Sequence, residues 1–250
     1  CIRDRIYAAT AEIPGLQFNP NTDGWTFPKD VYDIFAAGEQ NDVDTIVGFN
    51  ANEGTALFAG VANDLAGYEQ WLEANYGDSA PAFKAVYPAA TDDQARVAAY
   101  ENMADHFFGW QMRTWARLQT DTGTKPVHMY YFTRVPPWDE GEKYGAYHAA
   151  EIIYAFDNFA KSSGIRDEIG PFTHAWEDAD RELARSMNSY WINFATTGDP
   201  NGEGLADWPV FDPKGDAVIE FGDSIEVVSG VLQNKLDVFD SHYASVRSDR

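Results

Sequence analysis

Residues 43 to 54 read VDTIVGFNANEG and combine a short apolar run with a polar turn. The first seven residues are rich in β-branched side chains and are bounded by polar residues, which is typical of a buried strand in an α/β sheet. The turn carries Glu53, and the residues that follow it, TALFAG, are compatible with a helix. Because ligand-binding and catalytic groups of open α/β sheets collect beyond the carboxyl ends of strands, Glu53 is a candidate site residue. The alternative is a solvated turn carboxylate or an acid that stabilises a helix N-terminus.

A second polar turn surrounds His148 within GAYHAAEIIYAFDN, residues 145–158. Small residues flank the histidine and leave its imidazole room to reach neighbours from elsewhere in the fold. The apolar residues that follow predict a short helix packed against a core: Ile152, Ile153, Ala155 and Phe156. An imidazole titrates near neutral pH, so His148 is a candidate general base. Its alternative role is packing or helix capping.

The order of predicted elements places both turns at one edge of a sheet. A strand predicted near 126–134 is followed by a loop that leads to His148, just as the strand near 43–49 leads to Glu53. The complete prediction has strands near 43–49, 126–134 and 217–228, the last as a hairpin, and helices near 92–120, 171–197 and 230–243, with shorter helical segments near 31–37 and 68–76.

Charge and composition exclude several classes of function. With 18 basic and 40 acidic residues among 250, the formal charge is −22, which repels nucleic acid backbones and anionic membrane surfaces. Cys1 is the single cysteine, so neither an internal disulfide nor a thiolate metal cluster is available. The sequence contains no apolar run long enough to span a bilayer and no recognisable export signal. It begins without Met, in residues that read like the middle of a helix, and we expect a fragment of a longer protein.

Several motif interpretations fail on spacing. The serine elbow G-x-S-x-G is absent, since Gly77 to Pro81 and Gly222 to Glu226 each lack the second glycine. The second of these, within FGDSI, is similar to the nucleophile block of GDSL-type hydrolases, but His242 lacks the aspartate three positions before it. The H-x-x-E sequences that begin at His148 and His174 lack the third ligand of a metal site. Phosphate-binding glycine motifs are absent as well, so no metal and no cofactor is expected.

Four stretches spread over most of the chain carry a resemblance when they are taken together: NTDGWTFP (21–28), VGFNANEGTALF (47–58), GAYHAAEIIYAF (145–156) and SYWINFATTGDPN (189–201). In this order they resemble the C-terminal half of the type-B carboxylesterase and cholinesterase family. The resemblance implies fold class α/β, as the C-terminal half of an α/β-hydrolase whose central, mostly parallel sheet is flanked by helices. Residues 1–250 would be the C-terminal portion of a single domain that is incomplete without its N-terminal half.

The resemblance also implies roles for individual residues. Glu53 matches the acid of a catalytic triad and His148 matches its base, while the serine and the oxyanion glycines would lie upstream. The family's acyl pocket is walled by residues just after the acid, here Ala56, Leu57 and Phe58. Residues near the substrate gorge would be Tyr147 and the segment 107–110, including Phe108, and residues that support the site would be Asp105 and Glu151.

The implied function is serine-dependent hydrolysis of a carboxylic ester, with a small-molecule ester and the N-terminal half that carries the serine as partners. The lack of a possible internal disulfide favours a microbial carboxylesterase, similar to para-nitrobenzyl esterases. The sequence leaves the compartment open, although a secreted or periplasmic location is preferred. The competing interpretation is a non-catalytic adhesion or binding module, because some relatives of this fold have lost catalysis.

Overall fold

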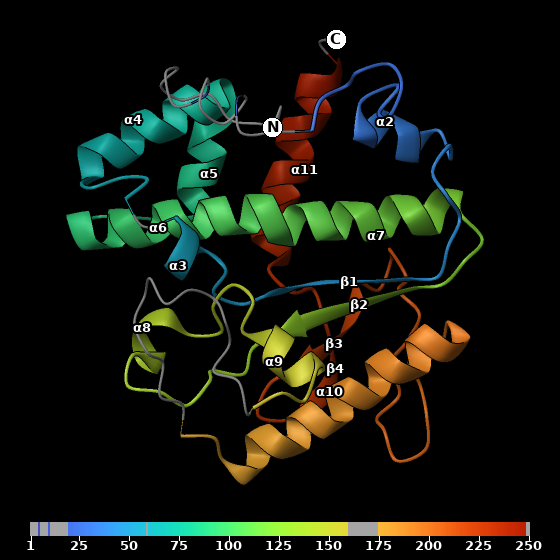
Figure 1. The fold of residues 1–250 in the computed structure, drawn as a ribbon. Helices are drawn as coiled ribbons and strands as arrows, with labels where there is room; N and C mark the ends of the chain where they lie inside the picture. Colours follow the sequence, from blue (N-terminus) through green and yellow to red (C-terminus); the bar gives the residue numbers. More distant parts are fainter. Residues whose placement is uncertain (1–4, 6–9, 11–19, 59, 160–174, 249–250) are drawn as a thin grey trace. The chain divides into compact units, whose positions relative to one another are not determined.

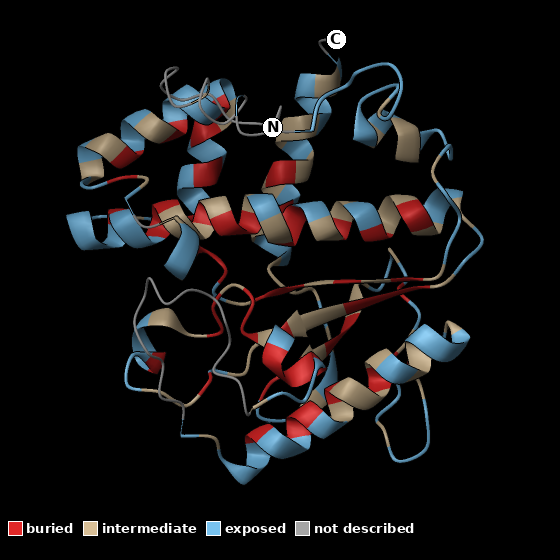
Figure 2. Cartoon of the chain, in the orientation of Figure 1, coloured by how far each residue is buried: buried red, intermediate tan, exposed pale blue. Residues whose placement is uncertain are grey.

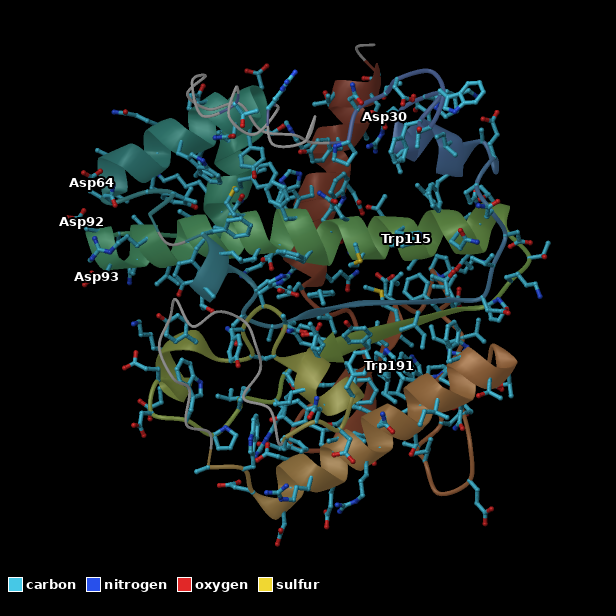
Figure 3. The ribbon with its side chains drawn as sticks, viewed as in Figure 1. Asp30, Asp64, Asp92, Asp93, Trp115 and Trp191 are labelled. Carbon is cyan, nitrogen blue, oxygen red and sulfur yellow. The ribbon has the colours of Figure 1, made fainter. Side chains whose placement is uncertain are left out.

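The computed structural model describes residues 5, 10, 20–58, 60–159 and 175–248. The chain divides into two compact units, residues 1–40 and 41–250. In the first unit, helix α2 (Val31–Ala36) begins at Asp30, whose carboxylate accepts a hydrogen bond from the N–H of Tyr32 (Figure 3). Among the described residues, no helix has both the length and the apolar character that crossing a membrane requires.

The second unit is built on a four-stranded sheet in the order β1 (Thr45–Asn50), β2 (Val127–Phe132), β3 (Ala217–Phe221) and β4 (Ile225–Ser229). The first three strands are parallel, with Thr45 opposite Val127 and Tyr130 opposite Ile219, and β4 returns antiparallel to β3. The predicted strands occur at these places, and the first runs one residue further than expected, to Asn50. The prediction of a mostly parallel sheet is confirmed.

One face of the sheet is covered by a long helical run (Figure 1). It consists of α6 (Asp92–Ala104), a π-helical segment η2 (Asp105–Trp110) and α7 (Gln111–Thr122). Apolar residues of β1 and β2, including Val47 and Met129, pack with Ala116 on this side. The sequence predicts a single helical run over 92–120 but not the π turn, because an inserted residue shifts the apolar spacing without interrupting it.

Helices α9 (Glu151–Ala155) and α10 (Asp178–Thr197) lie on the other side of the sheet (Figure 1). Figure 2 shows buried residues along the sheet and on the inner sides of these helices. Trp191 points from α10 toward the sheet, where its ring lies 5.6 Å from that of Tyr130 (Figure 3). Of the predicted helix 171–197, the first four residues lie outside the described residues. Residues 175–177 precede α10. The helix begins after Glu177, because the backbone N–H of Glu177 donates to the Asp180 carboxylate at 2.9 Å in a capping box.

A second helical layer packs on the outer side of α6 and η2. It comprises α4 (Leu65–Tyr76), the short turn η1 (Gly77–Ser79), α5 (Ala80–Val86) and α11 (Gln233–Ser248), around an aromatic core that includes Tyr68, Phe83 and Phe239. Acidic residues begin two helices of this region, α4 and α6. Asp64 caps α4, and Asp92 and Asp93 occupy the first turn of α6 (Figure 3). The sequence does not predict α5, which is only seven residues long and carries Pro81 in its first turn.

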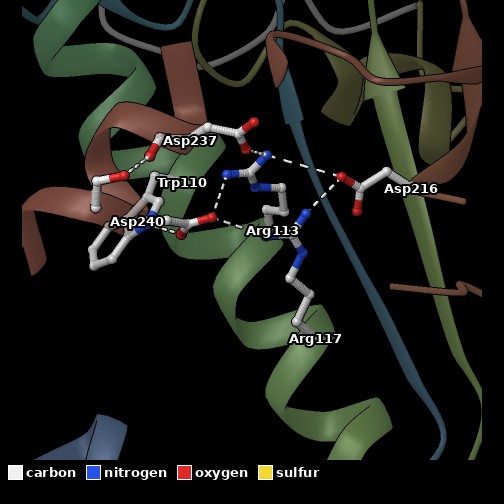
Figure 4. Close-up of polar contacts among 7 residues, drawn as sticks. Trp110, Arg113, Arg117, Asp216, Asp237 and Asp240 are labelled. Atoms are coloured by element: carbon white, nitrogen blue, oxygen red, sulfur yellow. Dashed lines mark hydrogen bonds and ion pairs between the residues drawn. The ribbon is translucent and has the colours of Figure 1, made fainter. Parts of the chain in front are cut away.

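Ion pairs connect α11 to α7 (Figure 4). The guanidinium of Arg113, which is buried, donates to Asp237 at 3.0 Å and to Asp240 at 2.7 Å. Arg117 donates to Asp240 at 2.9 Å and to Asp216, in the turn before β3, at 2.6 Å. The last helix and the sheet are thereby joined to α7 by charge-assisted hydrogen bonds.

Candidate active site

The first half of the site forms where β1 ends. The backbone N–H of Asn50, the last residue of the strand, donates to Oε1 of Glu53 at 2.8 Å. Glu53 is buried at 5% exposure and stands at the N-cap of the short helix α3 (Gly54–Leu57). Glycine follows the acid because a Cβ at Gly54 would lie 2.3 Å from the backbone oxygen of Tyr100. The strand end and the packed helix therefore fix the position of this carboxylate.

The second half lies in the loop between α8 (Gly141–Tyr144) and α9. Here Nδ1 of His148 lies 2.6 Å from Oε2 of Glu53, so the structure brings together the two residues that the sequence predicts as base and acid. The next residue, Ala149, has a φ of 69°. Left-handed backbone at a residue other than glycine costs about 1 kcal/mol, and such strain is concentrated at functional sites.

The surroundings of His148 suit a proton acceptor. The hydrogen bond with the Glu53 carboxylate raises the pKa of His148 above its ordinary value, and this effect outweighs the opposing effect of partial burial. The side chain is 41% exposed. Its other nitrogen, Nε2, has no hydrogen bond to any residue that the structure describes. One ring nitrogen is thus held by a buried carboxylate while the other is open to a further group.

Backbone and side-chain hydrogen bonds join the two loops. The N–H of Asn52 donates to the carbonyl of Ala146 at 3.0 Å, and Oδ1 of Asn52 accepts from the N–H of Ala146 at 2.9 Å. Gly145 precedes this pair with a φ of 62°, and a Cβ there would lie 2.1 Å from Oδ1 of Asn52. The close approach of the two loops therefore requires glycine at position 145.

The side-chain amide of Asn50 makes two further contacts, one on each side of His148 in the sequence. The side-chain Nδ2 of Asn50 donates to the carbonyl of Tyr147 at 2.8 Å and to Oε2 of Glu151 at 2.5 Å. Burial raises the pKa of Glu151 above its ordinary value, and the hydrogen bond from Asn50 opposes this rise. Glu151, predicted as a supporting residue, is therefore connected to the site through Asn50.

Aromatic rings line one side of His148. The ring of Phe108 lies 5.0 Å from the imidazole, measured between centroids, and 6.4 Å from the ring of Phe58. Phe107 lies 5.6 Å from Phe58 and is 44% exposed. The π-helical turn brings these neighbouring phenylalanines to the same partner. Leu57 is 47% exposed.

Tyr147 has a different environment from the other predicted pocket residues. Its side chain is buried and its ring packs against Trp138 at 6.0 Å. Its backbone pairs with Asn52 and accepts from Asn50. In the structure, Tyr147 therefore belongs to the support of the histidine loop.

Asp105, the other predicted supporting residue, lies in a separate cluster. It accepts from the hydroxyl of Tyr87 at 2.8 Å and lies 3.6 Å from Nζ of Lys235. Burial raises the pKa of Asp105 to about 6. Its described contacts hold η2 against α5 and α11, and none of them is to Glu53 or His148.

The apolar residues after His148 differ in part from the expected pattern. Ile153 and Ala155 are buried in the core, as predicted, whereas Ile152 is 47% and Phe156 is 71% exposed. The helix α9 is only five residues long, so it presents one side to the core and leaves the other uncovered. The prediction that all four residues pack inward is wrong for these two.

A contact between a serine and a histidine occurs away from this site. Oγ of Ser79, in the stretch that approaches a serine elbow, lies 3.0 Å from Nδ1 of His242. The described neighbours of His242 are aromatic rings, including Tyr76 and Phe83, and none is a carboxylate. Burial lowers the pKa of His242 below its ordinary value. Without an acid to orient it, this pair lacks the third member of a triad.

Sequence reasoning missed Asn50 and Asn52, which hold the two loops together. Both asparagines stand in the polar turn that follows the predicted strand, which makes them recognisable as candidates. The sequence does not identify the loop that they contact. Among the residues that the structure describes, no group of three or more His, Cys, Asp or Glu side chains is placed to hold a metal ion.

Comparison with known proteins gives the site its context. The profile of the carboxylesterase family matches residues 4–239. Fumonisin B1 esterase of Sphingopyxis macrogoltabida is 29% identical over 209 residues, which cover 82% of this chain and 37% of that protein. Carboxylesterase 1C of Rattus norvegicus is 27% identical over 237 residues, which cover 86% of this chain and 41% of that protein. The chain thus spans about two fifths of the length of these relatives.

Solved structures agree in fold. A PNB esterase structure superimposes with a TM-score of 0.69 at 23% identity, covering 94% of this chain and 48% of that one. A thermophilic PNB esterase gives a TM-score of 0.70 at 22% identity, covering 94% and 46%. These likenesses show the α/β-hydrolase fold that the sequence predicts. With a family profile that matches nearly its whole length and a fold shared with solved esterases, the chain belongs to the carboxylesterase family.

Proposed function

We propose that this chain supplies the acid and the base of a serine-dependent carboxylic ester hydrolase. The observation that carries the proposal is the 2.6 Å contact between Glu53 and His148, with Nε2 of the histidine left open. Membership of the carboxylesterase family supports the reaction class. Because the chain covers 37% of the fumonisin B1 esterase and 48% of the PNB esterase structure, we propose that the serine elbow and the oxyanion hole belong to an N-terminal half.

The proposed reaction uses the histidine twice. Nε2 of His148 takes the proton from the serine hydroxyl as the serine oxygen bonds to the ester carbonyl carbon. The Glu53 carboxylate stays ionised, holds Nδ1–H and stabilises the imidazolium. His148 then donates the proton to the leaving alcohol as the ester C–O bond breaks. Water attacks the acyl-enzyme in the same way, and this second cycle releases the acid and the free serine.

We propose that apolar residues of α3 and η2, which are exposed or half-buried, line the substrate pocket beside His148. In this proposal Leu57, Phe58 and Phe108 form one wall, and the buried Tyr147 supports the loop that carries His148. Such a wall suits an apolar acyl or alcohol group of a small ester.

The test is the hydrolysis of p-nitrophenyl acetate and butyrate by the protein joined to its N-terminal half. His148→Ala and Glu53→Gln are expected to lower kcat by about 10⁴-fold with an intact circular dichroism spectrum, as loss of a triad member does. The matched control is His242→Ala, which removes the histidine beside Ser79 and is expected to leave kcat unchanged.

The competing proposal is a binding module without catalysis. It would gain support if the protein with its N-terminal half bound small esters but turned none over. Near-normal rates in His148→Ala would refute the role of this histidine as base. Loss of activity in His242→Ala alone would assign the chemistry to Ser79 and His242.

A further inference from the structure

We infer that Asn50 is a positioning residue of the active site, which sets the geometry of Glu53 and His148 at the same time. This inference rests on the proposed function, since it assigns a role within the same site. Asn50 is 2% exposed and is the last residue of β1. It belongs to the sheet through its backbone, and its described hydrogen bonds reach the acid, the histidine loop and α9.

The first contact orients the acid. The backbone N–H of Asn50 donates to Oε1 of Glu53 at 2.8 Å, and the other carboxylate oxygen is the one bonded to His148. Among the described residues β1 is the first strand in the sheet order, and the N–H of Asn50 donates to this side chain rather than to β2. The carboxylate is thereby turned so that Oε2 faces the imidazole.

The second contact orients the base. Nδ2 of Asn50 donates to the carbonyl of Tyr147, the residue directly before His148. The same amide donates to Oε2 of Glu151, at the start of the helix after the histidine loop. The loop is therefore held on both sides of the histidine by one amide group, which limits the movement of the imidazole relative to Glu53.

The direction of the amide is fixed by its partners. Both groups that it contacts, a peptide carbonyl and a carboxylate, are acceptors, so the NH₂ must face them. Oδ1 of Asn50 is buried without a hydrogen-bond partner among the described residues. A buried amide that leaves one atom unsatisfied costs free energy. Proteins tolerate such a cost at functional sites, and here the other hydrogen bonds of the same side chain position the residues of the site.

A change of Asn50 to aspartate separates this role from simple packing. The two side chains have the same shape, but aspartate is an acceptor and faces the Tyr147 carbonyl and Glu151 without a donor. The charged groups facing the imidazole are Glu53 and Glu151, and the half-buried Tyr130 also lies near these acids. A third carboxylate there favours the protonated imidazole.

The experiment measures the pH dependence of kcat/KM for p-nitrophenyl butyrate in the protein joined to its N-terminal half. Asn50→Asp is expected to lower kcat by about 10-fold to 100-fold with a smaller change in KM, as a misplaced catalytic group does. The acid limb of the pH profile of kcat/KM should move to higher pH in this variant. The double variant Asn50→Asp/Glu151→Gln exchanges donor and acceptor without adding charge, and should recover part of kcat and return the limb toward the wild-type position.

The control is Asn102→Asp, at a fully buried asparagine of α6 that accepts from the hydroxyl of Tyr76. It is expected to lower the melting temperature without moving the pH profile. The inference is overturned if Asn50→Asp behaves like this control, or if the double variant is no better than the single one. If Asn50→Asp does not fold, the double variant is compared with the single variant Glu151→Gln. A kcat below that of Glu151→Gln supports the inference, and an equal kcat overturns it. Failure of the proposed function itself would appear differently, as a wild-type protein without ester hydrolysis.

Discussion

At the scale of single residues, Glu53 and His148 come from loops 95 positions apart and meet at 2.6 Å. The sequence predicts both, because each follows the end of a predicted strand and parallel strands end at the same sheet edge. It does not predict the contact distance or the state of the imidazole. Those depend on Asn50 and Asn52, whose partners in the histidine loop lie almost a hundred residues away in the chain.

Glu151 offers a prediction about pH. Its carboxylate and that of Glu53 both raise the pKa of His148. Only the neutral imidazole accepts a proton, so activity rises as pH passes through this raised pKa from below. Glu151→Gln removes one negative charge, and the acid limb of kcat/KM is expected to move to lower pH, with rates near wild type at pH 8. An exposed control, Glu226→Gln on β4, should leave the limb in place. A limb that moves upward in Glu151→Gln would contradict the assigned electrostatics.

At the scale of elements, the sequence predicts the parallel strands and the long helices well, since their apolar spacing extends over many residues. It misses η2, α5 and α8, and it indicates α3 only as residues compatible with a helix after Glu53. Tertiary contacts help to set such segments: Asp105 of η2 is buried against Tyr87, and Gly54 of α3 packs against the backbone of Tyr100. Short segments of this kind have too few residues to show a periodic pattern.

Gly145→Ala tests the connection between the two loops. Alanine at a φ of 62° costs about 1–2 kcal/mol for the left-handed backbone, and its Cβ would also displace Oδ1 of Asn52. We expect kcat/KM to fall by about tenfold or more. The matched control is Gly204→Ala, where φ is 80° and a Cβ meets nothing within 4 Å. Gly204→Ala introduces the same backbone strain without a steric clash. Equal losses of activity in the two variants would show that the close approach of residue 145 to Asn52 does not matter.

Arg113→Ala tests the link between α7 and α11 (Figure 4). The change leaves Asp237 without the ion pair to Arg113 and removes one of the two arginines bound to Asp240. Loss of one partner of a buried ion pair costs about 3–5 kcal/mol, and we expect about 3 kcal/mol because these acids are 51% and 39% exposed. Urea unfolding measures the change. Arg96→Ala, at an exposed pair with Asp93, should cost less than about 1 kcal/mol. Equal costs would contradict the role of burial.

At the scale of the whole molecule, the chain carries the two residues proposed as acid and base, and it spans less than half of its structural neighbours. The short elements α3, η2 and α9 and the residue after α9 expose Leu57, Phe107, Ile152 and Phe156, each at 44% or more. We expect the N-terminal half to cover these residues. Expressed alone, the chain should aggregate and hydrolyse no p-nitrophenyl ester, and refolding it together with the N-terminal half should restore hydrolysis. A soluble, monomeric chain that unfolds cooperatively by itself would contradict this expectation.

The most direct test of the acid and base assignment is covalent labelling with a fluorophosphonate, which reacts with serines activated by a histidine. The protein joined to its N-terminal half is treated with the reagent, digested and analysed by mass spectrometry, in parallel with His148→Ala. We predict a single modified serine outside residues 1–250 and no modification in His148→Ala. A modified serine within residues 1–250, or undiminished labelling of the variant, would contradict the account.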